Sequence, residues 1–99
     1  MDEKQREVLR KCSDYLIENI TPSRLMDILY SDGILTADDL IRLGKEGTPT
    51  DQNRMLVVNM LPKAGPEAFS SLLTALKKTE QHFIVEHLQK QLKKGIFVL

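Results

Sequence analysis

The chain has 99 residues, which suffices for one domain around a single hydrophobic core and is too short for two. Its 41% hydrophobic and 28% charged residues are typical of a soluble globular protein and exclude a disordered chain. Lys and Arg number 14, as do Asp and Glu, and this balance argues against a dedicated nucleic-acid-binding domain. No apolar run approaches the ~20 residues of a membrane-spanning helix. The single cysteine, Cys12, excludes an internal disulfide and fits a reducing cytosolic or nuclear setting.

Apolar residues at helical spacing predict a first helix over residues 2–19. Ser13 and Asp14 lie inside this pattern, and because both side chains compete for backbone hydrogen bonds we expect a bend there. One apolar stripe follows the helix, made up of Val8, Leu9, Cys12, Leu16 and Ile20.

Start and stop signals define the next two helices. Thr21 and Pro22 are typical of an N-cap and a first helical residue, and Asp32-Gly33 ends that second helix. Thr36 opens a short third helix, with Asp39 three residues later as an acidic variant of the capping box. The residues expected on its buried side are Leu40, Ile41 and Leu43.

The fourth helix begins at Thr48-Pro49, and its nearly continuous apolar run over residues 55–61 predicts that it is the most buried. Pro62 cannot continue it, because proline lacks a backbone N–H. Gly65 can then adopt a positive φ or act as an N-cap, and Pro66 suits the first position of a fifth helix. The short break makes the two helices close neighbours.

Phe69, Leu72, Leu73 and Leu76 form the stripe of the fifth helix. We expect Thr79 to cap a sixth helix that ends at Gly95. The domain is then residues 1–95, and residues 96–99 are a tail that either packs on the bundle or belongs to a truncated linker. The predicted fold is all-α, an antiparallel bundle of six helices.

The residues that could support catalysis lack suitable neighbours. Cys12 lies on the apolar stripe, where a small buried hydrophobe is the expected role. The i, i+5 spacing of His82 and His87 turns them roughly 140° apart on a helix, which makes a poor metal pair. Asp38 and Asp39 are adjacent, so they do not converge on one substrate. We therefore predict that the chain is not itself an enzyme and uses no metal or cofactor.

Charge is distributed unevenly and is the candidate for function. A basic set lies on the first and fourth helices and just after the fourth: Arg6, Arg10, Lys11, Arg54 and Lys63. An acidic set lies on the second and third helices: Asp27, Asp32, Asp38 and Asp39. If the sets occupy opposite faces, one molecule can bind the next head to tail, which gives an open helical assembly. The alternative is that these residues are ordinary solvated helix faces.

Three stretches carry a resemblance to the caspase recruitment domain family of the death-fold superfamily, over residues 2–92. They are Val8-Leu9-Arg10, the segment Leu29–Thr36, and Asn59–Phe69 with Leu72 and Leu76 downstream. Within the family, the chain is most similar to the recruitment domains of a death adaptor and of initiator caspase prodomains. The resemblance implies a death-fold (Greek-key) topology, and pairing between a basic face and an acidic face built from the two sets above.

The function that this resemblance implies is a cytoplasmic homotypic interaction module that recruits or clusters an initiator caspase in apoptotic signalling. The expected partner is another caspase recruitment domain, in a caspase, an adaptor or a scaffold, with neither a membrane nor nucleic acid involved. One alternative is a stand-alone decoy with the same fold. Another is a small helical nucleic-acid-binding domain that places five lysines on phosphates: Lys77, Lys78, Lys90, Lys93 and Lys94.

Overall fold

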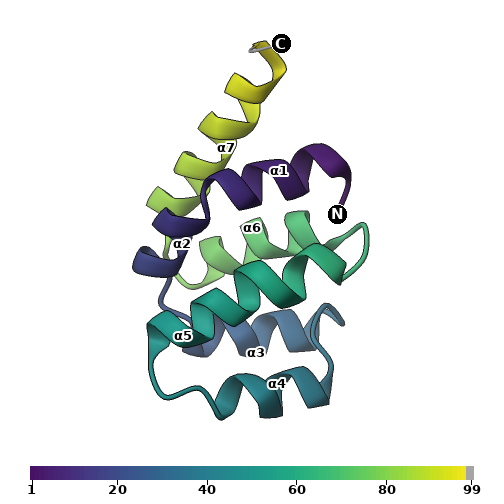
Figure 1. Ribbon diagram of the computed structural model, residues 1–99, viewed down its shortest axis with the longest axis vertical. Coiled ribbons are helices and arrows are strands. Elements are labelled where there is room, and N and C mark those ends of the chain that lie inside the picture. The colour runs from purple at the N-terminus through teal and green to yellow at the C-terminus, as the bar shows by residue number, and fades with distance from the viewer. Residues whose placement is uncertain (98–99) are drawn as a thin grey trace.

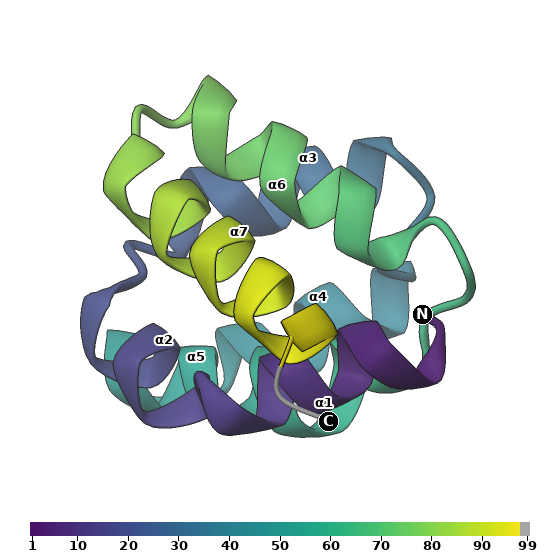
Figure 2. The same cartoon turned by 90° about the horizontal axis from the view of Figure 1, so that it is seen from above.

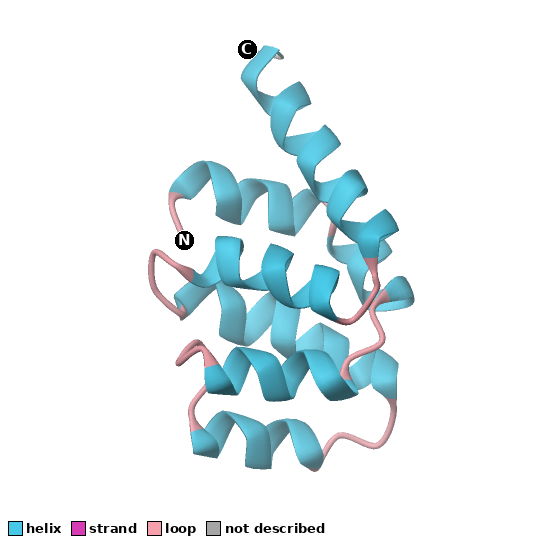
Figure 3. Ribbon diagram, turned by 180° about the vertical axis from the view of Figure 1, so that it is seen from behind, coloured by secondary structure: helices cyan, strands magenta, loops and turns pink. Residues whose placement is uncertain are grey.

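The computed structural model describes residues 1–97, and every regular element in that range is helical (Figures 1 and 3). The α-helices are α1 Glu3–Lys11, α2 Ser13–Asn19, α3 Ser23–Ser31, α4 Ala37–Gly44, α5 Pro49–Arg54, α6 Ala68–Lys78 and α7 His82–Phe97. Between α5 and α6 lie the π-helix η1, Met55–Met60, and the short 3₁₀-helix η2, Leu61–Lys63. Because α1 and α2 form one broken helix and η1 continues α5, this is the predicted six-helix bundle.

The helices form two sides with α7 across their end. In Figure 2, α1, α2 and α5 lie along one side, and α3 and α6 along the other. The α1 helix packs against α7 and η1, α2 packs against α5, and α3 packs against both α4 and α6. The second half of α7 extends away from the bundle in Figure 1, along a longest dimension of 40 Å. None of the described helices is long and apolar enough to cross a membrane.

The core is formed by the apolar stripes of all these helices. Its largest fully buried side chains are Phe69, Leu9, Leu16, Leu25, Leu29, Leu43, Leu56, Leu61, Leu72, Leu76, Ile84 and Leu88. At roughly 1.5–3 kcal/mol for each large apolar side chain removed from water, this burial is the main favourable term in folding.

The break in the first helix lies at Cys12, one residue before the predicted bend. Cys12 leaves the helical conformation, with φ −92° and ψ 3°, and α2 restarts at Ser13. Its thiol is buried, and burial raises the pKa of this group. The break lets the apolar stripe continue into α2, where Leu16 is buried.

Two start signals are confirmed. Thr36 accepts a hydrogen bond from the Asp39 backbone N–H, and the Asp39 carboxylate accepts one from the Thr36 N–H, both at 3.0 Å. Thr48 likewise accepts from the Asp51 N–H, with Pro49 in the first turn. The second helix differs from the prediction, because α3 begins at Ser23 and the Thr21 side chain makes no capping bond.

The segment from Leu61 to Phe69 turns the chain as expected, with one correction. Pro62 lies inside η2, and Gly65 has a φ of +99°, which glycine adopts readily. Pro66 is not the first residue of the fifth helix, since Glu67 is the N-cap and α6 begins at Ala68. Two turn residues precede the helix, so Pro66 shapes the loop instead.

The last helix begins and ends elsewhere than predicted. Thr79 does not cap it, because its hydroxyl donates to the carbonyl oxygens of Ala75 and Leu76 at the end of α6. The final helix starts at His82 and continues past Gly95 to Phe97. The tail expected at residues 96–99 is therefore helical at 96 and 97, and its last two residues lie outside the described range.

A buried amide fastens α5 to the end of α2. Asn53 is 1% exposed, and its Nδ2 donates to the carbonyl oxygens of Ile17 at 3.0 Å and Ile20 at 2.8 Å. Helix ends leave carbonyls without intrahelical partners, so this side chain supplies the missing donor. Asn53 thereby holds α5, the helix that carries Arg54, against the end of α2.

Candidate protein-interaction site

The basic set begins on α1, where Arg6, Arg10 and Lys11 are all exposed. Arg10 donates to both carboxylate oxygens of Glu7, at 2.6 and 3.2 Å. This hydrogen bond lowers the pKa of Glu7 and raises the pKa of Arg10. Arg6 donates from Nη1 to the Met1 carbonyl at 2.5 Å. The guanidinium groups of α1 are thus held in place by contacts within the chain.

Arg10 and Arg6 border a groove between α1 and η1. The groove has a volume of about 310 Å³, and its lining also includes Leu9, Ser13, Val57, Val58 and Pro62. Leu9 and Val57 are buried, whereas Val58 is 53% exposed. The arrangement is an apolar hollow with two cationic groups at its edge, which suits an apolar group that carries negative charge beside it.

The other two basic residues, Arg54 and Lys63, do not line this groove. Arg54, on α5, donates to the Asp51 carboxylate at 2.8 Å, and both side chains are about half exposed. Lys63, in η2, lines a different hollow that it shares with Asp39 and Arg42. One member of the basic set therefore lies beside one member of the acidic set.

The acidic set occupies α3 and α4, which pack against each other. Asp27 and Asp38 are exposed on these two helices. Asp39 is partly covered and serves the capping box with Thr36. Asp32 is the C-cap of α3 and lines a hollow with Glu67 and Lys78 of the α6 region. Asp27, Asp32 and Asp38 are thus the exposed members of the acidic set, and Asp39 is the partly covered one.

Sequence reasoning missed the exposed apolar residues. Ile41 was expected on the buried side of its helix but is 58% exposed, while Leu43 is fully buried. Val58 was expected in the most buried helix, yet only its neighbours Leu56, Val57, Met60 and Leu61 are buried and Met55 is half-buried. The signal was present in the spacing, since adjacent residues on a helix point about 100° apart and cannot all face one core.

The groups considered for catalysis are separated in space or engaged elsewhere. His87 stacks on Tyr15 of α2, with ring centroids 3.8 Å apart and an interplanar angle of 13°. His82 is exposed at the start of α7. Within residues 1–97, no three His, Cys, Asp or Glu side chains are grouped so that they could hold a metal ion.

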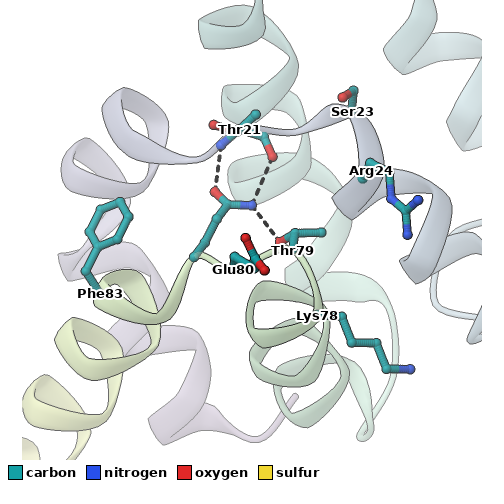
Figure 4. A pocket seen from close by; sticks show the side chains of 8 residues that line it. Thr21, Ser23, Arg24, Lys78, Thr79, Glu80 and Phe83 are labelled. Carbon is teal, nitrogen blue, oxygen red and sulfur yellow. Dashed lines mark hydrogen bonds between the residues drawn. The ribbon is translucent and has the colours of Figure 1, made fainter.

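A polar hollow lies where the α2–α3 and α6–α7 connections meet (Figure 4). Gln81 is 6% exposed there; its Oε1 accepts from the Thr21 N–H at 2.8 Å, and its Nε2 donates to the Thr21 carbonyl at 3.1 Å. Nε2 also donates to the Thr79 hydroxyl at 2.7 Å. Because its amide is fully used within the chain, this site joins segments of the fold.

The fold and the site together define a class: an all-helical death-fold domain whose exposed chemistry is that of a binding surface. The predicted fold, a six-helix Greek-key bundle, is confirmed. The model of the caspase recruitment domain family matches residues 6–91, and the chain belongs to that family.

Two caspases are similar in sequence to this chain. It is 29% identical over 102 aligned positions to caspase-2 of Gallus gallus, an alignment that covers all of this chain and 24% of the relative. It is 30% identical over 92 positions to caspase-9 of Homo sapiens, covering 90% of this chain and 22% of the relative. The chain therefore spans about a quarter of the length of these relatives, and its similarity is to initiator caspases.

Proposed function

We propose that this domain recruits or clusters an initiator caspase by binding another caspase recruitment domain through complementary charged faces, in cytoplasmic apoptotic signalling. Its role is binding, with catalysis left to the protease that it brings together. The observation that carries the proposal is the pair of guanidinium groups, Arg6 and Arg10, beside the α1–η1 groove, with Asp27 and Asp38 exposed on α3 and α4. Opposite charges of this kind select a partner and speed encounter.

Charge reversal tests the proposal. Arg10→Glu and Asp27→Arg should each weaken binding to the recruitment domain of caspase-9 or caspase-2 by about tenfold or more, since like charges brought together cost several kcal/mol. The two faces engage different surfaces of a partner, so the reversals should affect different probes or different ends of one assembly. Calorimetric titration measures the affinity, and circular dichroism and thermal melting check that the fold is unchanged.

Lys90→Glu is the matched control, because Lys90 is an exposed residue of α7 outside both sets. Its binding should equal that of the wild type. If both reversals bind each probe as tightly as the control does, the charged-face mechanism is wrong.

The decoy function shares this binding step and differs in its outcome. Added to a reaction in which a recruitment domain clusters an initiator caspase, a decoy lowers protease activation, whereas a recruiting module fused to the protease raises it. The same charge reversals should abolish either effect.

The nucleic-acid alternative requires the five lysines to act together. Lys77 and Lys78 end α6, while Lys90, Lys93 and Lys94 follow along α7. At 1.5 Å per residue, Lys94 lies about 18 Å along α7 from His82. The five lysines thus lie on two different helices. Titration with duplex DNA at low salt tests this alternative, which predicts binding that weakens steeply as salt is added.

A further inference from the structure

The chain contains two Thr-Pro dipeptides, Thr21-Pro22 and Thr48-Pro49, and no Ser-Pro. A hydroxyl directly before a proline is the acceptor that proline-directed protein kinases require, and protein kinases bind their substrates in an extended conformation. The residue before a proline is biased toward that conformation. Both dipeptides precede a helix, so the local sequence does not distinguish them, whereas the structure does.

Thr48-Pro49 lies at the end of an open connection. Residues 45–48 join α4 to α5 and curve around the outer edge of the bundle (Figure 1). Gly47, Thr48 and Pro49 are all exposed, and a Cβ atom added at Gly47 would meet no atom within 4 Å. Thr48 already has an extended backbone, with φ −138° and ψ 155°. A kinase can therefore reach this hydroxyl from solvent.

The hydrogen bonds that hold Thr48 are local. Its hydroxyl accepts from the Asp51 N–H at 3.1 Å, and its carbonyl accepts from the Gln52 N–H at 3.0 Å. Both bonds lie in the first turn of α5, where the backbone N–H groups have no partner further along the helix. Unwinding this single turn is enough to extend the chain on both sides of Thr48.

Thr21-Pro22 is held by a distant part of the chain. The buried Gln81 amide binds both the N–H and the carbonyl of Thr21, at 2.8 and 3.1 Å (Figure 4). Pro22 is buried, and its carbonyl accepts from the Met26 N–H at 2.9 Å. Extending this segment would break contacts between residues sixty positions apart. The fold thus protects Thr21 and leaves Thr48 available.

Thr48 is close to the basic set through one neighbour. Thr48, Asp51 and Arg54 follow at intervals of three residues, so each is next to the following one on the surface of α5. Asp51 pairs with Arg54 at 2.8 Å, so these two charges balance. A phosphoryl group adds a charge of about −1.5 to −2 at neutral pH. Its addition to Thr48 would make this end of α5 acidic, beside Arg54 of the basic set.

We propose that Thr48 is a phosphorylation site for a proline-directed serine/threonine kinase, and that the phosphoryl group weakens binding through the basic set. In the transfer, the bond from the γ-phosphorus of ATP to its bridging oxygen breaks as a bond to Thr48 Oγ1 forms. ADP leaves with the bonding electron pair, and the threonine proton passes to the catalytic base of the kinase. The effect on binding rests on the proposed function, whereas the modification itself does not.

Treatment of the folded chain with ATP and a mitogen-activated or cyclin-dependent protein kinase tests the site. The intact mass should rise by a single phosphoryl group, and fragmentation should locate it at Thr48. Thr48→Val should remove the product, and Thr21→Val should not. Gln81→Ala should add modification at Thr21, because it frees the backbone that the amide holds.

Thr48→Ser is the matched control for folding. Thr48→Val also loses the capping bond from the Asp51 N–H, whereas Thr48→Ser keeps a hydroxyl for both the cap and the kinase. Thr48→Ser should therefore melt as the wild type does and still be modified. The site is wrong if a kinase that modifies a flexible Thr-Pro peptide leaves Thr48 unmodified, or modifies Thr21 of the wild type as fast.

Calorimetric titration of the purified phosphorylated chain tests the effect on binding. The first probe is a caspase-9 or caspase-2 recruitment domain whose binding Arg10→Glu weakens. Its dissociation constant should rise about fivefold or more, since like charges are brought together. The difference should shrink as salt is added, because the new charge is exposed. A probe whose binding Asp27→Arg weakens should bind the modified and unmodified chains equally.

The outcomes separate this inference from the proposed function. The inference is overturned if the phosphorylated chain binds the first probe as tightly as the unmodified chain does. If Thr48 is not modified and Arg10→Glu still weakens binding, the inference fails and the proposed function stands. If Thr48 is modified and no recruitment domain binds either form, the proposed function fails and only the phosphorylation site remains.

Discussion

On the α1 side of the molecule, guanidinium groups border an apolar groove, whereas on the α3–α4 side Asp27, Asp38 and Ile41 are exposed. The arginines of the first side already have partners, since Arg10 pairs with Glu7 and Arg54 with Asp51. Within the described residues no ion pair involves Asp27 or Asp38. The basic side must exchange an internal contact for an external one, and the acidic side need not. The two charged faces therefore differ in how readily they can bind a partner.

Removing the base of the groove should have the largest effect. Leu9 is 1% exposed, and Leu9→Ala should lower the free energy of unfolding by about 2–5 kcal/mol. Leu29→Ala, beneath α3, should cost a similar amount and leave the groove intact. Denaturant unfolding measures both, and self-association is compared well below the melting temperatures. We expect only Leu9→Ala to lose association; an equal loss in both variants would mean that the two faces do not differ as described.

Asn53 holds α5, which carries Arg54, against α2, and it can be replaced without changing any charged residue. Asn53→Ala removes the donor to the Ile17 and Ile20 carbonyls and should destabilise the domain by about 1–3 kcal/mol. Asn53→Asp should be worse, because a carboxylate facing two carbonyl oxygens can only accept. Urea unfolding at neutral pH ranks the variants, and the donor role would be contradicted if Asn53→Asp were more stable than Asn53→Ala.

Asp39 belongs to both the acidic set and the capping box, and two substitutions distinguish its roles. Asp39→Ala loses the acceptor for the Thr36 N–H and should cost about 1 kcal/mol of stability. Asp39→Asn keeps an acceptor oxygen and should cost less than Asp39→Ala. If binding falls equally in both while melting differs, the charge of Asp39 contributes to the acidic face; if binding follows melting, its role is to cap α4.

The smallest effect on stability is expected at Glu7, which is exposed. Its pKa is lowered by the hydrogen bond with Arg10, so the pair stabilises the fold above the usual glutamate pKa and is lost as the pH falls through the lowered value. Glu7→Gln should leave the melting temperature nearly unchanged, because exposed pairs contribute little. The substitution releases Arg10, so the affinity for an acidic partner should rise. A calorimetric titration that shows weaker binding would contradict the idea that Glu7 and the partner compete for Arg10.

The sequence predicts most of the fold because its signals are local. The capping residues Thr36 and Thr48, the positive φ of Gly65 and the apolar stripes each depend on neighbours within a few positions. For Ile41 and Val58 the spacing shows only that some apolar residue of each run must be left in water, and the packing of the other helices decides which one. Thr79 was misread for a different reason, because a threonine between two helices can bond to either one, and its hydroxyl donates to the carbonyls of the helix that precedes it.

For the candidate site, the sequence supplies candidate residues and says less about how they are arranged. Arg6 and Arg10 share a surface because they are four residues apart. That Lys63 lies in a hollow with Asp39, or that Asp32 lies in another with Lys78, depends on contacts between distant segments. The π-helical turn of η1 was also not predicted, because no residue in Met55–Met60 is a known signal for it.

The contact formed by the Gln81 amide has a consequence for the rate at which the domain opens. This amide binds the N–H and the carbonyl of Thr21, sixty positions away, much as a neighbouring strand would in a sheet. A contact that closes so long a loop is expected to form late in folding, after the helices have met, because the entropy of closure must first be offset. Weakening it should accelerate unfolding and leave the folding rate almost unchanged. Gln81 therefore determines how long the assembled domain lasts more than how fast it forms.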